Sequence, residues 1–140
     1  MSKRKELFVL VVAEDRVIAA TLATVLQAGG YMVATTASGA TAARIAGRMV
    51  VDALVIDLPA ANPASLNFAA GLQRRYPSCH ITLVCSPSQR DQAAMLMEEA
   101  AVDCDFILRP ISRTELLAQL AAAPGVWSKP ELSKNHLQVA

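Results

Sequence analysis

Acidic, hydroxyl and cationic side chains stand directly after four apolar segments of the sequence. Glu14 and Asp15 follow the first segment, Asp57 ends the second, and Ser86 and Arg109 follow the last two. Carboxylates are ligands that a hard cation such as Mg²⁺ prefers, and a hydroxyl and a cation can neutralise phosphoryl oxygens. An aspartate can also act as a nucleophile and form an aspartyl phosphate. If these residues meet in the fold, they predict a site that binds magnesium and places a phosphoryl group beside it.

The apolar segments have the pattern of buried strands. The run 7–12 is unbroken and rich in valine, which is typical of a strand that is covered on both faces. Helical periodicity follows each such run, whereas two prolines predict an irregular loop over 58–63. The strands are predicted at 7–12, 31–35, 50–56, 81–85 and 106–108. The helices are predicted at 16–28, 39–49, 65–76, 88–102 and from 112 onward.

Polar residues near the helix starts supply predicted caps. Asp15 lies near the N-cap of the first helix, and the pair Gly29-Gly30 ends it. Ser65 is a predicted cap for the third helix. Capping boxes are predicted for the last two helices, from Ser88 with Asp91 and from Ser112 with Glu115.

Strands that alternate with helices predict a parallel sheet between two helical layers, joined by right-handed crossovers. In such α/β sheets the working site lies beyond the carboxyl ends of the strands. Any one of the polar residues could merely cap a helix or end a strand. Their joint placement at four strand ends favours a functional site. Periodicity alone does not give the strand order.

Length and charge limit the classes of function. The 140 residues predict one domain over 1–123, followed by a polar tail or linker over 124–140. A net charge of +1 offers no global field for nucleic acid or an anionic membrane. We expect neither a signal peptide nor a membrane span, and therefore a cytoplasmic protein. Cys79, Cys85 and Cys104 have no CxxC spacing and are predicted to be reduced thiols.

The sequence resembles the receiver domain of two-component response regulators, the CheY-like family. The resemblance covers residues 6–123 and rests on the order of elements, the acidic pair after the first strand, and two segments. These are Asp-Ala-Leu-Val-Ile-Asp at 52–57 and Phe-Ile-Leu-Arg-Pro at 106–110. It implies a five-stranded parallel sheet in the order 2-1-3-4-5 and a flavodoxin-like fold. It also implies a non-enzymatic signalling role with a histidine kinase or phosphotransfer protein as the partner.

The resemblance assigns roles to single residues. Asp57 takes the position of the phosphoacceptor, Glu14 that of a magnesium-binding acid, and Pro59 that of a residue whose backbone carbonyl binds the metal. Asp15 is a further candidate ligand, although helix capping is its favoured role. Ser86 and Phe106 match the hydroxyl and the aromatic ring that move on phosphorylation, Arg109 matches the site cation, and Pro110 matches a proline that is usually cis.

Three departures from the family pattern keep alternatives open. Ala13 replaces the first acid of the pair, Arg109 replaces a lysine, and Ala-Ala-Asn-Pro at 60–63 replaces the usual loop. Losing a carboxylate predicts magnesium binding that is weak or absent. The alternative function is therefore a pseudo-receiver, a phosphorylation-independent interaction or dimerisation module. A nucleotide- or flavin-binding enzyme is disfavoured, because no glycine-rich phosphate loop follows the first strand.

Overall fold

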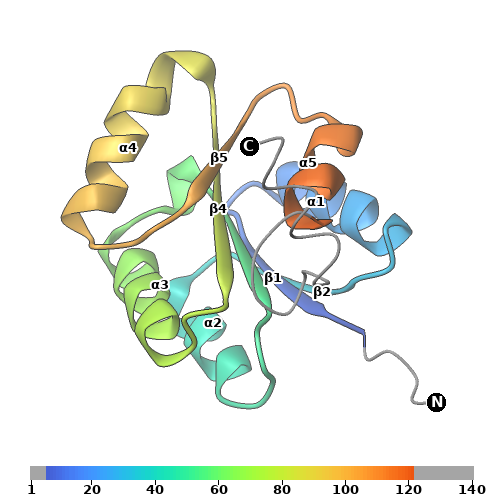
Figure 1. Cartoon of the computed structure of the whole chain (residues 1–140), viewed down its shortest axis with the longest axis horizontal. Helices are drawn as coiled ribbons and strands as arrows, with labels where there is room; N and C mark the ends of the chain where they lie inside the picture. Colours follow the sequence, from blue (N-terminus) through green and yellow to red (C-terminus); the bar gives the residue numbers. More distant parts are fainter. Residues whose placement is uncertain (1–5, 122–140) are drawn as a thin grey trace, which may run out of the picture.

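The computed structural model describes residues 6–121 and contains one parallel sheet with helices on both faces (Figure 1). The strands are β1 (Phe8–Val12), β2 (Met32–Thr36), β3 (Ala53–Asp57), β4 (His80–Cys85) and β5 (Asp105–Leu108). The helices are α1 (Arg16–Ala28), α2 (Gly39–Ala46), α3 (Pro63–Arg75), α4 (Arg90–Glu99) and α5 (Arg113–Ala121). The strand order is β2-β1-β3-β4-β5, so the predicted fold class is confirmed. The predicted tail 124–140 lies outside the described residues.

The three central strands of the sheet are β1, β3 and β4. Every residue of β1, β3 and β4 is buried, as the unbroken apolar runs predicted. Parallel pairing aligns the strands from end to end, with Val12 opposite Ile56 and Asp57 opposite Val84. The carboxyl ends of these strands therefore lie along one edge of the sheet.

Alternate strand residues point to two separate cores. Val9, Val11, Ala53 and Val55 pack with α1 and α5, whereas the residues between them pack with α2, α3 and α4. Figure 1 shows these two helical layers on opposite sides of the sheet. The helical side chains buried against the first group are Leu22, Leu26, Leu116 and Leu120. Burying a leucine of this kind contributes roughly 1.5–3 kcal/mol.

Several predicted helix ends are confirmed. Asp15 caps α1, since its Oδ1 accepts the backbone N–H groups of Val17 at 2.7 Å and Ile18 at 3.3 Å. Gly30 follows the helix with a φ of +97°, a conformation that glycine adopts without steric cost. Before α5, the Oγ of Ser112 accepts the N–H of Glu115 at 3.1 Å.

The predicted cap of the third helix, Ser65, was wrong. The third helix begins at Pro63, with Asn62 as its cap, because the Asn62 Oδ1 accepts the Ser65 N–H at 3.0 Å. Proline suits the first helical turn, where its missing N–H would have no partner. The loop predicted over 58–63 is also partly regular, since Leu58–Ala60 form a 3₁₀ turn.

The predicted capping box of Ser88 with Asp91 was wrong as well. The box that forms is Ser86 with Gln89, which opens a 3₁₀ turn over Pro87–Gln89, and α4 follows from Arg90. Smaller differences concern element ends. The third strand starts at Ala53 instead of 50, the second helix stops at Ala46 instead of 49, and α4 stops at Glu99 instead of 102.

Outside the predicted site, the side chains of chemical interest are three cysteines and His80. Cys79, Cys85 and Cys104 are free thiols, and burial raises the pKa of Cys79 and of Cys104 to about 12. These two thiols are therefore protonated, and poor nucleophiles, at neutral pH. His80 begins β4 at the edge opposite the predicted site, as expected. Within residues 6–121, no helix combines the length and the apolar character needed to cross a membrane.

Candidate functional site

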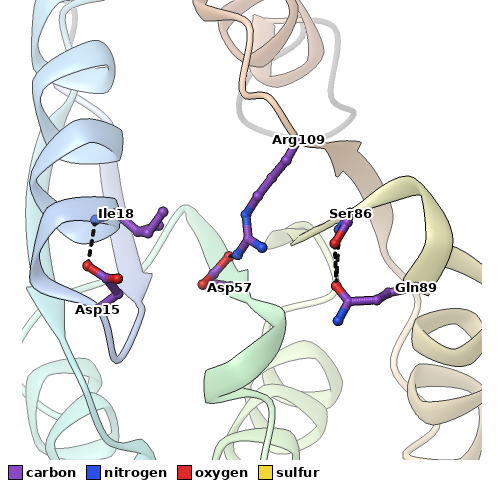
Figure 2. A network of polar contacts seen from close by, with 6 residues as sticks. All are labelled: Asp15, Ile18, Asp57, Ser86, Gln89 and Arg109. Carbon is purple, nitrogen blue, oxygen red and sulfur yellow. Dashed lines mark hydrogen bonds and ion pairs between the residues drawn. The ribbon is translucent and has the colours of Figure 1, made fainter.

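The strand ends that carry the predicted site residues lie side by side. Ala13 follows β1, Asp57 ends β3, Ser86 follows β4 and Arg109 follows β5. The pairing of Asp57 with Val84 and of Cys85 with Leu108 keeps the last three ends level. Figure 2 shows Asp57, Ser86 and Arg109 gathered at this edge, with Asp15 at the start of α1 beside them.

Strand alternation also places three of these side chains on the same face. Val11, Val55 and Ile107 belong to the core that faces α1 and α5. Ala13, Asp57 and Arg109 each stand two residues further along the chain, so they point to that face too. A longer side chain at Ala13 would therefore project beside the carboxylate of Asp57.

Asp57 and Arg109 form an ion pair at the centre of the site. Nη2 of Arg109 donates to Oδ1 of Asp57 (Figure 2). The Asp57 side chain is 2% exposed and that of Arg109 29% exposed, so water reaches the cation but hardly the carboxylate. Among the described residues, the buried Nε of Arg109 has no hydrogen-bond partner. The exposed part of the guanidinium therefore lies in its terminal nitrogens and not in Nε.

The surroundings of Asp57 act on its protonation in opposite directions. Burial raises the pKa of the Asp57 carboxyl, and the negative charges of Asp15 and Glu14 add to that rise. The Arg109 guanidinium opposes the rise through its charge and its hydrogen bond. The group is therefore more basic than an ordinary aspartate but remains paired with a cation. A carboxylate with a raised pKa is a stronger nucleophile once deprotonated.

Substituting Arg109 should shift the titration of Asp57 upward. The carboxyl pKa already lies above its ordinary value in the folded protein, and Arg109→Met removes the one group that lowers it. The titration midpoint should therefore move to still higher pH, read from the ¹³C shift of the Asp57 carboxyl during an acid titration. Arg74→Met, which changes an exposed arginine on α3, is the matched control. A midpoint that stays or falls in Arg109→Met would contradict this electrostatic account.

The carboxylates near Asp57 offer a divalent cation an incomplete set of ligands. Glu14 is exposed, and Asp15 already uses Oδ1 to cap α1. Pro59 lies in the turn directly after Asp57, and its backbone carbonyl is a further oxygen donor. Within residues 6–121, no group of three or more His, Cys, Asp or Glu side chains is arranged to hold a metal. The described residues thus fit a magnesium ion only in part.

Ser86 and Phe106 have neighbours that the sequence analysis missed. The Ser86 Oγ donates to Oε1 of Gln89 at 2.7 Å, and the Ser86 N–H donates to the same atom at 3.2 Å (Figure 2). The guanidinium carbon of Arg90 lies 4.4 Å from the centre of the Phe106 ring. The spacing of a serine and a glutamine three residues apart signals a capping box and could have revealed the first contact.

Phe106 is also fixed through its backbone. Gln119 on α5 donates from Nε2 to the Phe106 carbonyl at 3.2 Å and accepts from the buried Thr82 hydroxyl at 3.0 Å. The peptide bond between Arg109 and Pro110 is cis, as the resemblance implied. The two hydrogen bonds of Gln119 therefore tie α5 to β4 and to the backbone of β5.

Comparisons with known proteins agree with this geometry. A family model described as the response regulator receiver domain matches residues 9–121. The receiver domain of the TMAO respiratory system response regulator TorR is 25% identical, with a TM-score of 0.68, and the match covers 95% of this chain and 98% of that one. No curated protein matches significantly.

Two further solved structures share the fold. A response regulator from Thermotoga maritima is 21% identical with a TM-score of 0.68, and the match covers 82% of this chain and 94% of that chain. The chemotaxis protein CheY4 of Vibrio cholerae is 20% identical with a TM-score of 0.68, and the match covers 86% and 100% respectively. Since the family model covers nearly all the described residues and the sheet has the same order, the chain belongs to the response regulator receiver domain family.

Proposed function

We propose that this receiver domain accepts a phosphoryl group on Asp57 from a cytoplasmic histidine kinase or phosphotransfer protein. Receiver domains in general are signalling modules that interact with such donors. The observation that carries the proposal is the buried carboxylate of Asp57 at the end of a central strand, paired with the guanidinium of Arg109. This arrangement combines a nucleophile with a cation that can neutralise a transferred phosphoryl group.

The ion pair suggests which oxygen reacts. Oδ1 of Asp57 is engaged with Arg109, so Oδ2 would form the new bond to phosphorus. The bond between phosphorus and the donor nitrogen breaks, and its electron pair leaves with the donor imidazole. Arg109 then offers N–H donors to the phosphoryl oxygens, and charge-assisted bonds of this kind are roughly twice as strong as neutral ones.

Magnesium would bind beside Asp57, with Glu14 and the Pro59 carbonyl as the other protein ligands. When bound, such an ion neutralises phosphoryl oxygens. Ala13 contributes no ligand, and Mg²⁺ usually keeps several waters when the protein supplies one or two carboxylates. We therefore expect weak binding that depends on Asp57 and Glu14.

The output would pass through the face formed by α4, β5 and α5. Ser86 follows β4 and would donate its hydroxyl to a phosphoryl oxygen, and Phe106 lies within β5 beside it. Met95 on α4 is 61% exposed and suits an adaptable protein contact. We propose this face for the downstream partner or for a homodimer. No part of the proposal needs direct contact with nucleic acid.

The test is phosphoryl transfer from a small donor such as acetyl phosphate. Incubation with magnesium should add the mass of one phosphoryl group to the intact protein. The adduct should be lost at alkaline pH, as expected for an acyl phosphate and not for a phosphoserine. An unchanged mass under all conditions would instead support an interaction module that keeps the fold without the phosphorylation.

A further inference from the structure

Two consecutive residues at the start of α4 each contact one of the two proposed switch residues. Gln89 accepts both the hydroxyl and the N–H of Ser86, at 2.7 and 3.2 Å. Arg90 lies over the Phe106 ring, with its guanidinium carbon 4.4 Å from the ring centre. We name Gln89 and Arg90, with these contacts, the α4 clasp. Figure 2 shows the Gln89 side chain turned toward Ser86 at the edge of the site.

We propose that the α4 clasp holds Ser86 and Phe106 in the unphosphorylated arrangement, with Gln89 as a positioning residue that competes with the phosphoryl group for the Ser86 hydroxyl. The inference rests on the proposed function, since it needs Asp57 to carry the phosphoryl group. The α4 clasp would regulate the receiver from within this chain, because it sets how readily the receiver responds to phosphorylation.

The competition follows from the number of protons. A serine hydroxyl has one proton to donate, and Ser86 gives it to the Oε1 of Gln89. Donation to a phosphoryl oxygen on Asp57 therefore requires the contact with Gln89 to break. The new bond has a charged acceptor and is the stronger of the two, so phosphorylation still favours release. The contact with Gln89 reduces the net free energy gained when Ser86 donates to the phosphoryl oxygen. It therefore reduces the response to a given amount of phosphoryl donor.

The contact of Arg90 with Phe106 extends the effect of the α4 clasp to β5. Gln119 donates to the Phe106 carbonyl, which holds the backbone of β5 at this residue. A change of the Phe106 rotamer would carry the ring away from the Arg90 guanidinium and lose the cation–π contact. Because Gln89 and Arg90 are neighbours at the start of one helix, release of Ser86 and movement of Phe106 both act on the beginning of α4.

The test compares the affinity for beryllofluoride, a phosphoryl mimic, in the presence of magnesium. Gln89→Met keeps the length of the side chain and removes the acceptor. It should bind beryllofluoride roughly threefold to tenfold more tightly than the wild type, which corresponds to the net value of one hydrogen bond. Gln92→Met, at an exposed position one turn along α4, is the matched control and should bind like the wild type.

A double-mutant cycle separates positioning from a general loosening of the loop. In a Ser86→Ala background, which lacks the hydroxyl, Gln89→Met should leave the beryllofluoride affinity unchanged. Equal affinity in the wild type and Gln89→Met would overturn the clasp, and so would the same gain in the Ser86→Ala background. Both results leave the proposed function intact. If the wild type itself shows no beryllofluoride response at Asp57, the proposed function fails, and the clasp fails with it.

Discussion

Asp57→Asn is expected to abolish labelling by acetyl phosphate. The substitution keeps the shape of the side chain but replaces the carboxylate with an amide, which cannot form an acyl phosphate under these conditions. Asp57 is 1% exposed and its carboxylate is the one that Arg109 contacts, so no other described aspartate shares its surroundings. The mass of the intact protein should therefore remain that of the unmodified chain, whereas the wild type gains one phosphoryl group.

The matched control is Asp103→Asn. Asp103 is exposed and precedes β5, at the edge of the sheet opposite the site, and the bonds that it forms with Gln73 use its backbone groups. This variant should label like the wild type. Thermal unfolding of both variants, followed by circular dichroism, confirms that the chains are folded. Labelling that persists in Asp57→Asn would show that the acceptor lies elsewhere.

Ala13→Asp is expected to raise the affinity for magnesium by at least about tenfold. The alternation of β1 places the new carboxylate on the same face as Asp57, one strand away. A unit charge about 4 Å from another contributes on the order of 1 kcal/mol in water, and about twice that for a divalent ion. Isothermal titration of both proteins with magnesium chloride measures the change.

Ala13→Asn separates the effect of charge from that of shape. This variant has the same size as Ala13→Asp and no negative charge, so it should gain much less affinity. Because Ala13 is 3% exposed, both variants are expected to unfold at lower temperature than the wild type. Magnesium should restore the unfolding temperature of Ala13→Asp in particular. Equal magnesium affinities in all three proteins would show that position 13 does not face the ion.

The fold could be predicted largely because its central strands are buried and mostly apolar. β1 and β3 are recognisable from residues 7–12 and 53–56 alone, since strands covered on both faces need no polar side chain. The strand order came from the family resemblance, because periodicity says nothing about which strands are neighbours. Helix starts were harder to predict. Asn62 and Ser65 both suit an N-cap, and the competition between them is decided by loop geometry.

The candidate site was predictable to the extent that it follows from strand ends. Asp57 ends β3 and Arg109 comes directly after β5, so a parallel sheet brings them to the same edge. The α4 clasp was not predicted, because the sequence fits two capping boxes here, Ser88 with Asp91 and Ser86 with Gln89, and the predicted one was the first, whereas the 3₁₀ turn forms with the second. The contact of Arg90 with Phe106 depends on a side-chain conformation between elements that are separate in sequence.

The central claim, that Asp57 is the acceptor of a working switch, is tested most directly by amide NMR during a magnesium titration with and without beryllofluoride. The account predicts saturable shifts that begin at Asp57 and spread through Ser86 and Phe106 to α4 and α5 only when both are present. Spectra that remain unchanged at saturating concentrations of both would contradict it and would leave a receiver fold whose function lies in its binding surfaces.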